Sequence, residues 1–187
     1  MSRDLNLLQP AFREKVETML SECTSGGITM TPYYTIRTPE QQAKLWRQSR
    51  TAVEIQQQID WLRNHGAPYL ASVIEEVGPQ FGPKVTNAIP GLSWHQWGEA
   101  LDCFWNIENR AEWSSRKKLR LLNGREENGY RVYAETTVKH GMVAGGLWAS
   151  FKDWPHIQLR HQSISSFYSI AEVDQHMQAN FAYLVHN

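Results

Sequence analysis

The sequence predicts an α+β fold in which helices surround a small sheet. Apolar side chains recur at helical spacing in several stretches, and residues 28–36 are rich in β-branched and aromatic residues, which is typical of a strand. Glycine and proline residues separate these stretches. With 187 residues, 41% of them hydrophobic and 20% charged, the chain has the size and composition of one globular domain. We therefore expect a single domain over residues 1–187.

The chain opens with a predicted helix followed by a strand. Residues 5–20 place large apolar side chains on one helical face, and Gly26 and Gly27 end this pattern as a helix C-terminal signal does. Residues 28–36 are rich in β-branched and aromatic side chains in rough alternation, which predicts a strand. Pro32 cannot donate to a neighbouring strand, so it marks a sheet edge or a bulge.

Three helices are predicted in the next part of the chain. Thr38 can cap the first of them, with a proline in its opening turn and Gln41 completing a capping box. Further helices are expected over residues 51–65, which open with the same capping pattern, and over residues 69–77. Residues 78–90 are predicted to form a long surface loop, and such loops in compact domains are often functional.

The second half of the chain is predicted to be mostly helical. Helices are expected over residues 111–122 and 126–139, each followed by a glycine. A glycine-rich turn is expected at residues 143–146 and a short strand at residues 156–159. Residues 163–184 carry apolar side chains at helical spacing, which predicts a terminal helix.

The charge balance and the absence of long apolar runs exclude several classes of protein. The formal net charge is +0, so no positive field draws the chain to nucleic acid or to an anionic membrane surface. Neither the N-terminus nor any later stretch has the apolar run of a signal peptide or of a membrane span. We expect a protein made in the cytoplasm. Cys23 and Cys103 form no disulfide framework and are expected to be buried free thiols.

A histidine and an aspartate stand near each other in the segment from Ser93 to Asp102. His95 is the histidine, and the strand-like residues 103–105 follow, so both side chains can face one cavity. Imidazole nitrogen and carboxylate oxygen are good zinc ligands, and a catalytic zinc takes about three protein ligands with water in the open position. A third ligand must therefore come from elsewhere in the chain.

The pattern Asp-x-x-His at Asp153 and His156 supplies a second histidine with a carboxylate before it. If His156 reaches a metal from a strand, Asp153 in the preceding turn can lie beside the metal-bound water. Such a carboxylate can accept the proton of the attacking water and deliver it to the leaving amine. An isolated histidine is more often a core or surface residue than a metal ligand. Two segments that each supply a histidine and a carboxylate predict a metal site more strongly than either segment alone.

The two segments resemble the M15 family of zinc peptidases. The resemblance rests on Ser-x-His-x-x-Gly-x-Ala-x-Asp, which ends at Asp102, and on the downstream Asp-x-x-His. It extends over residues 33–158, because Arg37 and the residues after it resemble the Arg-containing strand-to-helix element of the family. The family includes D-alanyl-D-alanine carboxypeptidases and dipeptidases, and L-alanyl-D-glutamate endopeptidases that serve as phage endolysins. It implies a Hedgehog/D,D-peptidase-like fold with a small antiparallel sheet.

The resemblance also implies a role for each residue of the two segments. His95, Asp102 and His156 would hold Zn²⁺, and Asp153 would act as the general base. The base is often Glu in the family, but Asp occurs within its endopeptidase branch. Arg37 would be a catalytic cation facing the substrate carbonyl, where it would stabilise the oxyanion; the alternative is a surface ion pair.

Two polar residues are assigned to substrate binding. Ser93 lies in no Gly-x-Ser-x-Gly elbow, so we expect it to form hydrogen bonds in the cleft and not to be a nucleophile. Gln41 lies in the helix start that directly follows Arg37, and we expect both residues to face the substrate. The chain is longer than compact family members at residues 51–84, and residues 161–187 are expected to be a helical extension outside the catalytic part.

The leading functional hypothesis is an endopeptidase that cuts the L-Ala–D-Glu bond of peptidoglycan stems, as a phage or prophage endolysin does. It would be synthesised in the cytoplasm, act on the cell wall after release and work as a monomer. The alternative enzyme is a D-alanyl-D-alanine carboxypeptidase. A non-catalytic, zinc-stabilised binding module is a third hypothesis, since the Hedgehog signalling domain resembles this fold, but Asp153 and Arg37 favour catalysis.

Other histidines and the tryptophans have simpler interpretations. His65 and His140 precede glycines at predicted helix ends, where a histidine can interact with the last carbonyls. Trp94, Trp97, Trp148 and Trp154 flank the two segments and are expected to pack the walls of the metal site rather than to contact substrate.

Overall fold

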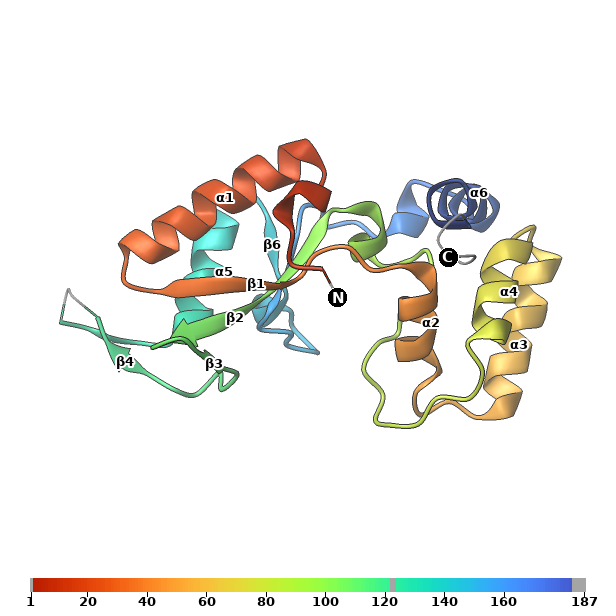
Figure 1. Ribbon diagram of the computed structural model, residues 1–187, viewed down its shortest axis with the longest axis horizontal. Helices are drawn as coiled ribbons and strands as arrows, with labels where there is room; N and C mark the ends of the chain where they lie inside the picture. The colour runs from red at the N-terminus through yellow and green to blue at the C-terminus, as the bar shows by residue number, and fades with distance from the viewer. Residues whose placement is uncertain (1, 122–123, 183–187) are drawn as a thin grey trace. The chain divides into compact units, whose positions relative to one another are not determined.

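The computed structural model describes residues 2–121 and 124–182, and it has the predicted α+β architecture (Figure 1). The chain divides into two compact units. The first contains Met1–Ile36 and Trp97–His161, and the second contains Arg37–Gln96 and Gln162–Asn187. The single domain over residues 1–187 stays a prediction. Among the described residues, no helix is long and apolar enough to cross a membrane.

The first unit is built on an antiparallel sheet with β2 (Ala100–Ile107) at its centre. One edge of β2 pairs with β1 (Thr29–Tyr34). The other edge pairs with β7 (His156–Gln158) at its beginning and with β3 (Arg110–Glu112) at its end. β6 (Val143–Ala144) pairs with β7 and completes the order β1-β2-β7-β6.

Side chains of β2 alternate between a buried face and an open face. Leu101, Cys103 and Trp105 are at most 1% exposed and belong to the hydrophobic core. α1 (Pro10–Ser25) and α5 (Gly129–Lys139) supply most of the remaining core side chains of this unit. The residues between the buried ones, among them Asp102, are partly exposed on the opposite face, as the period of two in a strand requires. β2 therefore presents polar chemistry on one face while its other face anchors the unit.

The second unit is helical. It consists of α2 (Pro39–Arg47), α3 (Ala52–Asn64), α4 (Pro68–Glu76) and α6 (Ile170–Phe181), and the short 3-10 helix η2 (Trp94–Trp97) begins in it. The predicted capping boxes at the starts of α2 and α3 are both formed. Residues 78–90 contain no helix or strand, as predicted.

α4 has no side-chain cap of its own, and α6 provides one. Ala67 stands at the N-cap and offers no hydrogen-bond acceptor in its side chain. The Leu70 amide donates instead to the Asp174 carboxylate, with an N–O distance of 2.7 Å. Asp174 is 3% exposed, and burial raises its pKa above the usual 3.8 although the amides of Leu70 and Tyr69 oppose the shift. This carboxylate couples two helices that are distant in the sequence.

The predicted helix over residues 111–122 is wrong. Residues 110–112 form β3, and β4 (Leu119–Arg120) pairs with β5 (Glu126–Glu127); residue 122 lies outside the described residues. A two-residue turn at Glu108 and Asn109, with φ values of 51° and 63°, folds β3 back onto β2. Positive φ at both positions is typical of a type I′ hairpin turn. Pairing with β2 therefore overrides a composition that favours helix.

Three other predicted helices begin or end differently. The prediction over residues 126–139 starts too early, because Gly129 is the first helical residue and lies against Trp105. The prediction over residues 5–20 covers the 3-10 helix η1 (Leu5–Leu7) and α1, which starts at Pro10 and continues to Ser25. The terminal prediction from residue 163 covers η4 (Ile164–Ser166) and α6, and residues 183 and 184 lie outside the described residues.

The predictions for His65 and for the cysteines are confirmed, whereas His140 stands at a helix end as predicted but its ring pairs with a carboxylate of another helix. His65 is the C-cap residue of α3, and its Nδ1 lies 2.7 Å from a carbonyl oxygen of that helix. His140 is the C-cap residue of α5 and pairs with Glu22, with Nε2–Oε2 at 2.9 Å. Cys23 and Cys103 are buried free thiols, and burial raises the pKa of both.

Candidate metal centre

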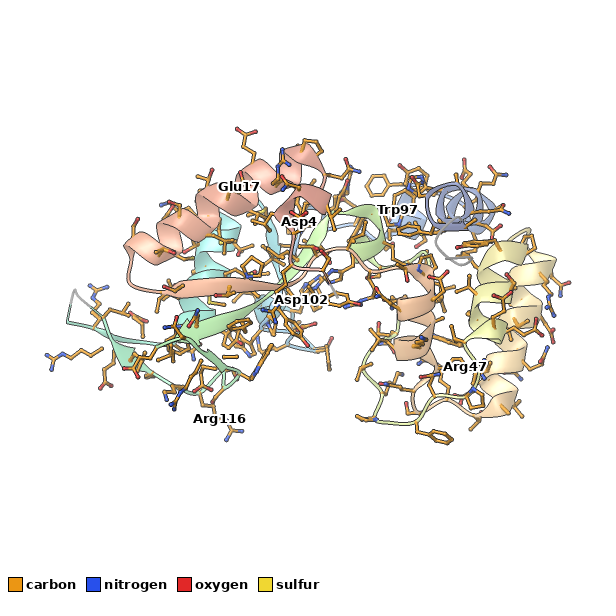
Figure 2. All side chains as sticks on the ribbon, viewed as in Figure 1. Asp4, Glu17, Arg47, Trp97, Asp102 and Arg116 are labelled. Carbon is orange, nitrogen blue, oxygen red and sulfur yellow. The ribbon has the colours of Figure 1, made fainter. Side chains whose placement is uncertain are left out.

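Asp102 and His156 are brought together by the pairing of β2 with β7. The two residues are direct cross-strand partners in this antiparallel ladder. Side chains of such partners project from the same face of a sheet within contact distance. Their Nδ1 and Oδ1 atoms lie 2.9 Å apart. The placement of both residues in one site therefore follows from strand register; Asp102 is labelled in Figure 2.

His95 completes a cluster of three candidate metal ligands. It lies in η2, just before the loop that enters β2, and is 2% exposed. One ligand atom each from His95, Asp102 and His156 lies within 4.8 Å of the others. Ligand atoms about 2.0–2.2 Å from one cation are at most about 4.4 Å apart, so three atoms within 4.8 Å of one another lie close to the spacing of a metal site, and two imidazoles with one carboxylate fit zinc. The donor set therefore fits the metal predicted from the sequence.

The environment of His156 raises its pKa. Burial alone would lower the pKa, but the hydrogen bond and the charge of Asp102, with smaller contributions from Asp153 and Gln158, outweigh burial. The Nε2 atom of His156 lies 3.0 Å from Oε1 of Gln158. A proton and a metal ion compete for the nitrogen lone pair, so metal binding at this histidine weakens as the pH falls.

Asp153 lies in the turn that leads into β7. Its backbone amide donates to the Gly145 carbonyl at 3.1 Å, and its own carbonyl accepts from the His156 amide at 3.2 Å. A Cβ atom on Gly145 would come within 2.5 Å of the Asp153 carbonyl oxygen and 3.2 Å of the His156 Cβ. Glycine at position 145, which begins the 3-10 helix η3 (Gly145–Leu147) directly after β6, thus allows this close packing, and the turn sets Asp153 at a fixed separation from His156.

Tryptophans pack beside this turn in the first unit. The rings of Trp148 and His156 have centroids 5.3 Å apart. Trp154 covers Gly146, where a Cβ atom would come within 2.4 Å of the indole. Both contacts agree with the predicted role of these tryptophans as packing groups, and they limit the orientations open to the His156 ring.

The three predicted substrate-side residues belong to the second unit. The Arg37 amide donates to the His95 carbonyl at 3.3 Å, and its Nη1 donates to Oε1 of the buried Gln42 at 2.9 Å. Gln41 is used in the capping box of α2, where its Oε1 accepts from the Thr38 amide at 3.0 Å. The carbonyl of Ser93 accepts from Gln96 at the start of η2. The backbone thus links Arg37 to His95, while the roles of Arg37, Gln41 and Ser93 in binding remain predictions.

Sequence reasoning missed Gln158 and Gln42. Gln158 contacts His156, and it is the next residue on the same face of β7. Gln42 is fully buried and connects Arg37 to the carbonyl of Ala88, to which its Nε2 donates at 2.7 Å. The alternation of side chains along a strand could have suggested Gln158. No local signal distinguishes Gln42 from its neighbour Gln41, because its partner lies in a distant loop.

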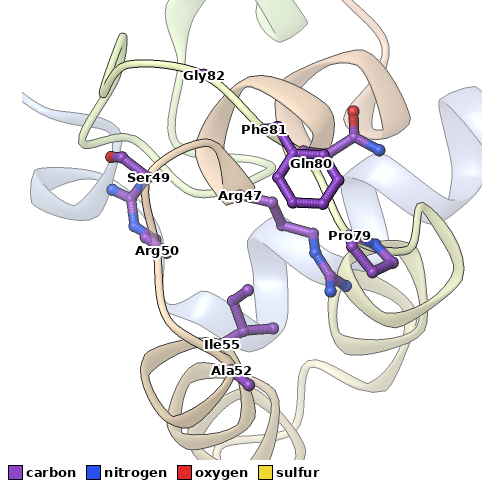
Figure 3. A pocket seen from close by; sticks show the side chains of 9 residues that line it. All are labelled: Arg47, Ser49, Arg50, Ala52, Ile55, Pro79, Gln80, Phe81 and Gly82. Atoms are coloured by element: carbon purple, nitrogen blue, oxygen red, sulfur yellow. The ribbon is translucent and has the colours of Figure 1, made fainter.

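A cavity of about 330 Å³ in the second unit contains none of the predicted site residues (Figure 3). Its two arginines support the fold. Arg47 Nη1 donates to the carbonyl of Ile74 in the last turn of α4 at 2.7 Å, and Arg50 Nη2 donates to the carbonyl of Thr86 at 3.0 Å. The lining residues are Arg47, Ser49, Arg50, Ala52, Ile55, Pro79, Gln80, Phe81 and Gly82.

Two imidazoles and a carboxylate within reach of one cation, with a further carboxylate in the adjoining turn, are groups that a metal-dependent hydrolase uses. The chain belongs to the VanY family, whose model, described as D-alanyl-D-alanine carboxypeptidase, matches residues 5–154. The resemblance to zinc peptidases of the M15 family is thereby confirmed. The chain is a zinc peptidase of the class that acts on peptidoglycan.

Two solved structures are similar at low identity. One is the crystal structure of the L-Ala D-Glu endopeptidase ChiX of Serratia marcescens, with 15% identity, a TM-score of 0.41 and 83% of each chain covered. The other is a mutant of the vancomycin resistance D,D-pentapeptidase VanY from a VanB-type resistance cassette in complex with Zn(II), with 13% identity and a TM-score of 0.43; 92% of this chain and 79% of that chain are covered. A comparison with curated proteins found no match. At these identities and TM-scores, the two likenesses assign no cleaved bond to this chain.

Proposed function

We propose that the chain is an endopeptidase that cuts the L-Ala–D-Glu bond of peptidoglycan stem peptides. The observation that carries the proposal is the position of Asp153, in a turn fixed on Gly145 immediately before the ligand His156. An aspartate at this place, where many family members have glutamate, resembles the endopeptidase branch. The family membership supports peptidoglycan as the substrate.

The metal would be held by His95, Asp102 and His156. When bound there, zinc lowers the pKa of a coordinated water and polarises the scissile carbonyl. Asp102 contributes a negative charge to the ligand set, and its Oδ1 lies 2.9 Å from Nδ1 of His156, a spacing that two atoms can have when they bind one cation. Gln158 holds the other side of the same ring. The three ligands come from different segments of the chain, and the bound metal would link these segments. Loss of one ligand would therefore weaken both metal binding and this link.

Asp153 would move the proton. As general base it accepts a proton from the attacking water, and as general acid it delivers that proton to the amine of the departing D-Glu residue. Arg37 would supply a positive charge near the carbonyl oxygen, where negative charge develops during attack. Its guanidinium is oriented by Gln42, and its backbone is hydrogen-bonded to His95.

A D-alanyl-D-alanine carboxypeptidase is the second candidate, and the description of the matching family model favours it. The two activities differ in where the scissile bond lies on the stem. The stem begins with L-Ala attached to the muramyl sugar, so one residue separates the sugar from the L-Ala–D-Glu bond. Four residues separate the sugar from the terminal D-Ala–D-Ala bond.

Mass analysis of digested peptidoglycan separates the two candidates. Purified protein with zinc is incubated with intact peptidoglycan and, separately, with a soluble muramyl pentapeptide. The proposal expects fragments that begin with a free D-Glu amine. Release of single D-Ala residues with the L-Ala–D-Glu bond intact would support the carboxypeptidase, and no product with either substrate would favour a non-catalytic module.

A further inference from the structure

The open face of the sheet in the first unit carries a cluster of aromatic side chains. We call Tyr33, Phe104 and Trp113 the aromatic platform. The ring centroids of Tyr33 and Trp113 are 5.2 Å apart with a nearly perpendicular arrangement, and those of Phe104 and Trp113 are 5.8 Å apart. Trp113 is 50% exposed, and the other two rings are partly exposed. Exposed clusters of large apolar groups usually mark binding surfaces.

The platform continues the sheet face that carries the metal ligand Asp102. Phe104 follows Asp102 by two residues in β2, so the two side chains project from the same face about 7 Å apart along the strand. Tyr33 lies at the bulge of β1, beside Tyr34, which is the strand partner of Asp102. A bulge redirects the side chain of the extra residue. Figure 1 shows β2 between β1 and β3 in this part of the unit.

Trp113 reaches the platform because β3 folds back on β2. It follows Glu112, the cross-strand partner of Trp105, so its position continues along β2 toward Phe104. The turn at Glu108 and Asn109, which sequence reasoning did not predict, is therefore what brings this indole beside Phe104. The platform is assembled from three strands and has no signature in any single stretch of sequence.

A cation lies over two rings of the platform and leaves Trp113 as its most exposed ring. The guanidinium carbon of Arg3 is 6.0 Å from the ring centroids of both Tyr33 and Phe104. A guanidinium offers five N–H donors in a planar fork. An exposed aromatic ring, here Trp113, with guanidinium donors over the neighbouring rings matches a pyranose ring, whose axial C–H bonds form an apolar face and whose rim carries hydroxyl and acetamido oxygens.

We propose that the aromatic platform binds the N-acetylmuramyl sugar to which the stem peptide is attached. The inference rests on the proposed cleavage of the L-Ala–D-Glu bond. With that bond at the metal centre, one extended residue, about 3.5 Å, and the lactyl ether link the bond to the sugar, which matches a platform that begins about 7 Å from Asp102. With the D-Ala–D-Ala bond at the metal centre, four residues, about 14 Å, would intervene and the sugar would lie beyond the platform.

The test uses two pentapeptide substrates that each contain both bonds. One has an N-acetylmuramyl group on L-Ala and the other has only an N-acetyl group. The zinc-loaded full chain is assayed on both by liquid chromatography and mass spectrometry. We expect cleavage at L-Ala–D-Glu with kcat/KM at least about 10-fold higher for the muramyl substrate, because stacking on aromatic rings stabilises the bound sugar.

Substitutions in the platform should change the ratio of the two kcat/KM values. Trp113→Ala should lower the ratio by at least about 3-fold, and Trp113→Tyr should restore most of it, because a tyrosine ring keeps the stacking surface. Trp61→Ala is the matched control: Trp61 is 43% exposed on α3 of the second unit, and its loss should leave the ratio unchanged. Calorimetric titration with N-acetylmuramyl-L-alanine gives a measure that needs no turnover, and Trp113→Ala should weaken that binding.

The outcomes separate the platform from the proposed function. Equal rates for the two substrates with cleavage at L-Ala–D-Glu, or a ratio that Trp113→Ala does not change, would overturn the platform and leave the endopeptidase standing. Release of D-Ala alone would overturn the endopeptidase and the inference with it. If neither substrate is cleaved, absence of calorimetric binding by N-acetylmuramyl-L-alanine overturns the platform.

Discussion

Residues 38–65 of the second unit and residues 107–121 of the first are organised by different kinds of interaction. α2 and α3 begin with capping boxes at Thr38 and Thr51 that are written in neighbouring residues. The hairpin of β3 depends on pairing with β2, and the first turn of α5 packs Gly129 against the indole of Trp105 in β2. The first region follows local signals, and the second follows contacts between segments that are distant in the sequence. This difference decides which parts of the molecule can be predicted.

The largest stability effect is expected at a close contact between distant segments, that of Gly129 in α5 with Trp105 in β2. Gly129→Ala would place a Cβ atom 2.3 Å from the Trp105 ring. We expect this overpacking to lower the free energy of unfolding by about 1–3 kcal/mol or more, since neither α5 nor β2 can move freely. Gly26→Ala is the control, because its nearest contact would be 3.3 Å and its φ is −79°.

Urea unfolding of the two glycine variants measures this difference. A Gly129→Ala protein as stable as the Gly26→Ala control would show that α5 is not held against Trp105.

A smaller effect is expected for Asp174, which supplies to α4 a cap that its own sequence lacks. Asp174→Ala removes the acceptor for the Leu70 amide and should cost about 1–2 kcal/mol. Asp174→Asn keeps an oxygen acceptor and should cost much less. Burial raises the folded-state pKa of Asp174 above 3.8, so protonation of this carboxyl group stabilises the folded protein. This stabilisation is fully present below pH 3.8 and is lost as the pH rises through the folded-state pKa.

The pH dependence provides the check on Asp174. Relative to Asp174→Asn, the wild-type protein should gain stability as the pH falls toward 3.8, measured by urea unfolding at several pH values. A stability difference between the two proteins that stays constant with pH would contradict a buried, ionisable carboxylate at this cap.

The smallest effect concerns the hairpin turn. Glu108 and Asn109 both have positive φ, which costs a residue such as glutamate about 1 kcal/mol. Replacing the pair with Asn-Gly, the preferred type I′ sequence, should raise the free energy of unfolding by about 0.5–1 kcal/mol. Thermal unfolding of this double variant tests the turn, and a loss of stability would indicate a different turn geometry.

The same contrast explains how far the sequence predicted the fold and the site. Caps, glycine stops and strand composition predicted α2, α3, α4, β1 and β7, because these signals lie within a few residues of each other. His95, Asp102, Asp153 and His156 could be proposed because two short patterns resemble a known family. The contacts of Gln158 and Gln42, and the position of Trp113, depend on pairing and packing across the chain, for which no local pattern exists.

The central claim is that Asp102 binds the metal while Asp153 moves the proton, and one comparison tests it directly. Zinc content and the rate of peptidoglycan cleavage are measured for Asp153→Asn and Asp102→Asn beside the wild-type protein. The wild type should hold about one zinc ion per chain. Asp153→Asn should keep its zinc and fold while turnover falls at least about 10²-fold, because an amide cannot accept the proton. Asp102→Asn should lose zinc as well as activity, since a neutral amide is a poor zinc ligand. Near-normal activity of Asp153→Asn, or loss of its zinc as readily as from Asp102→Asn, would contradict the account.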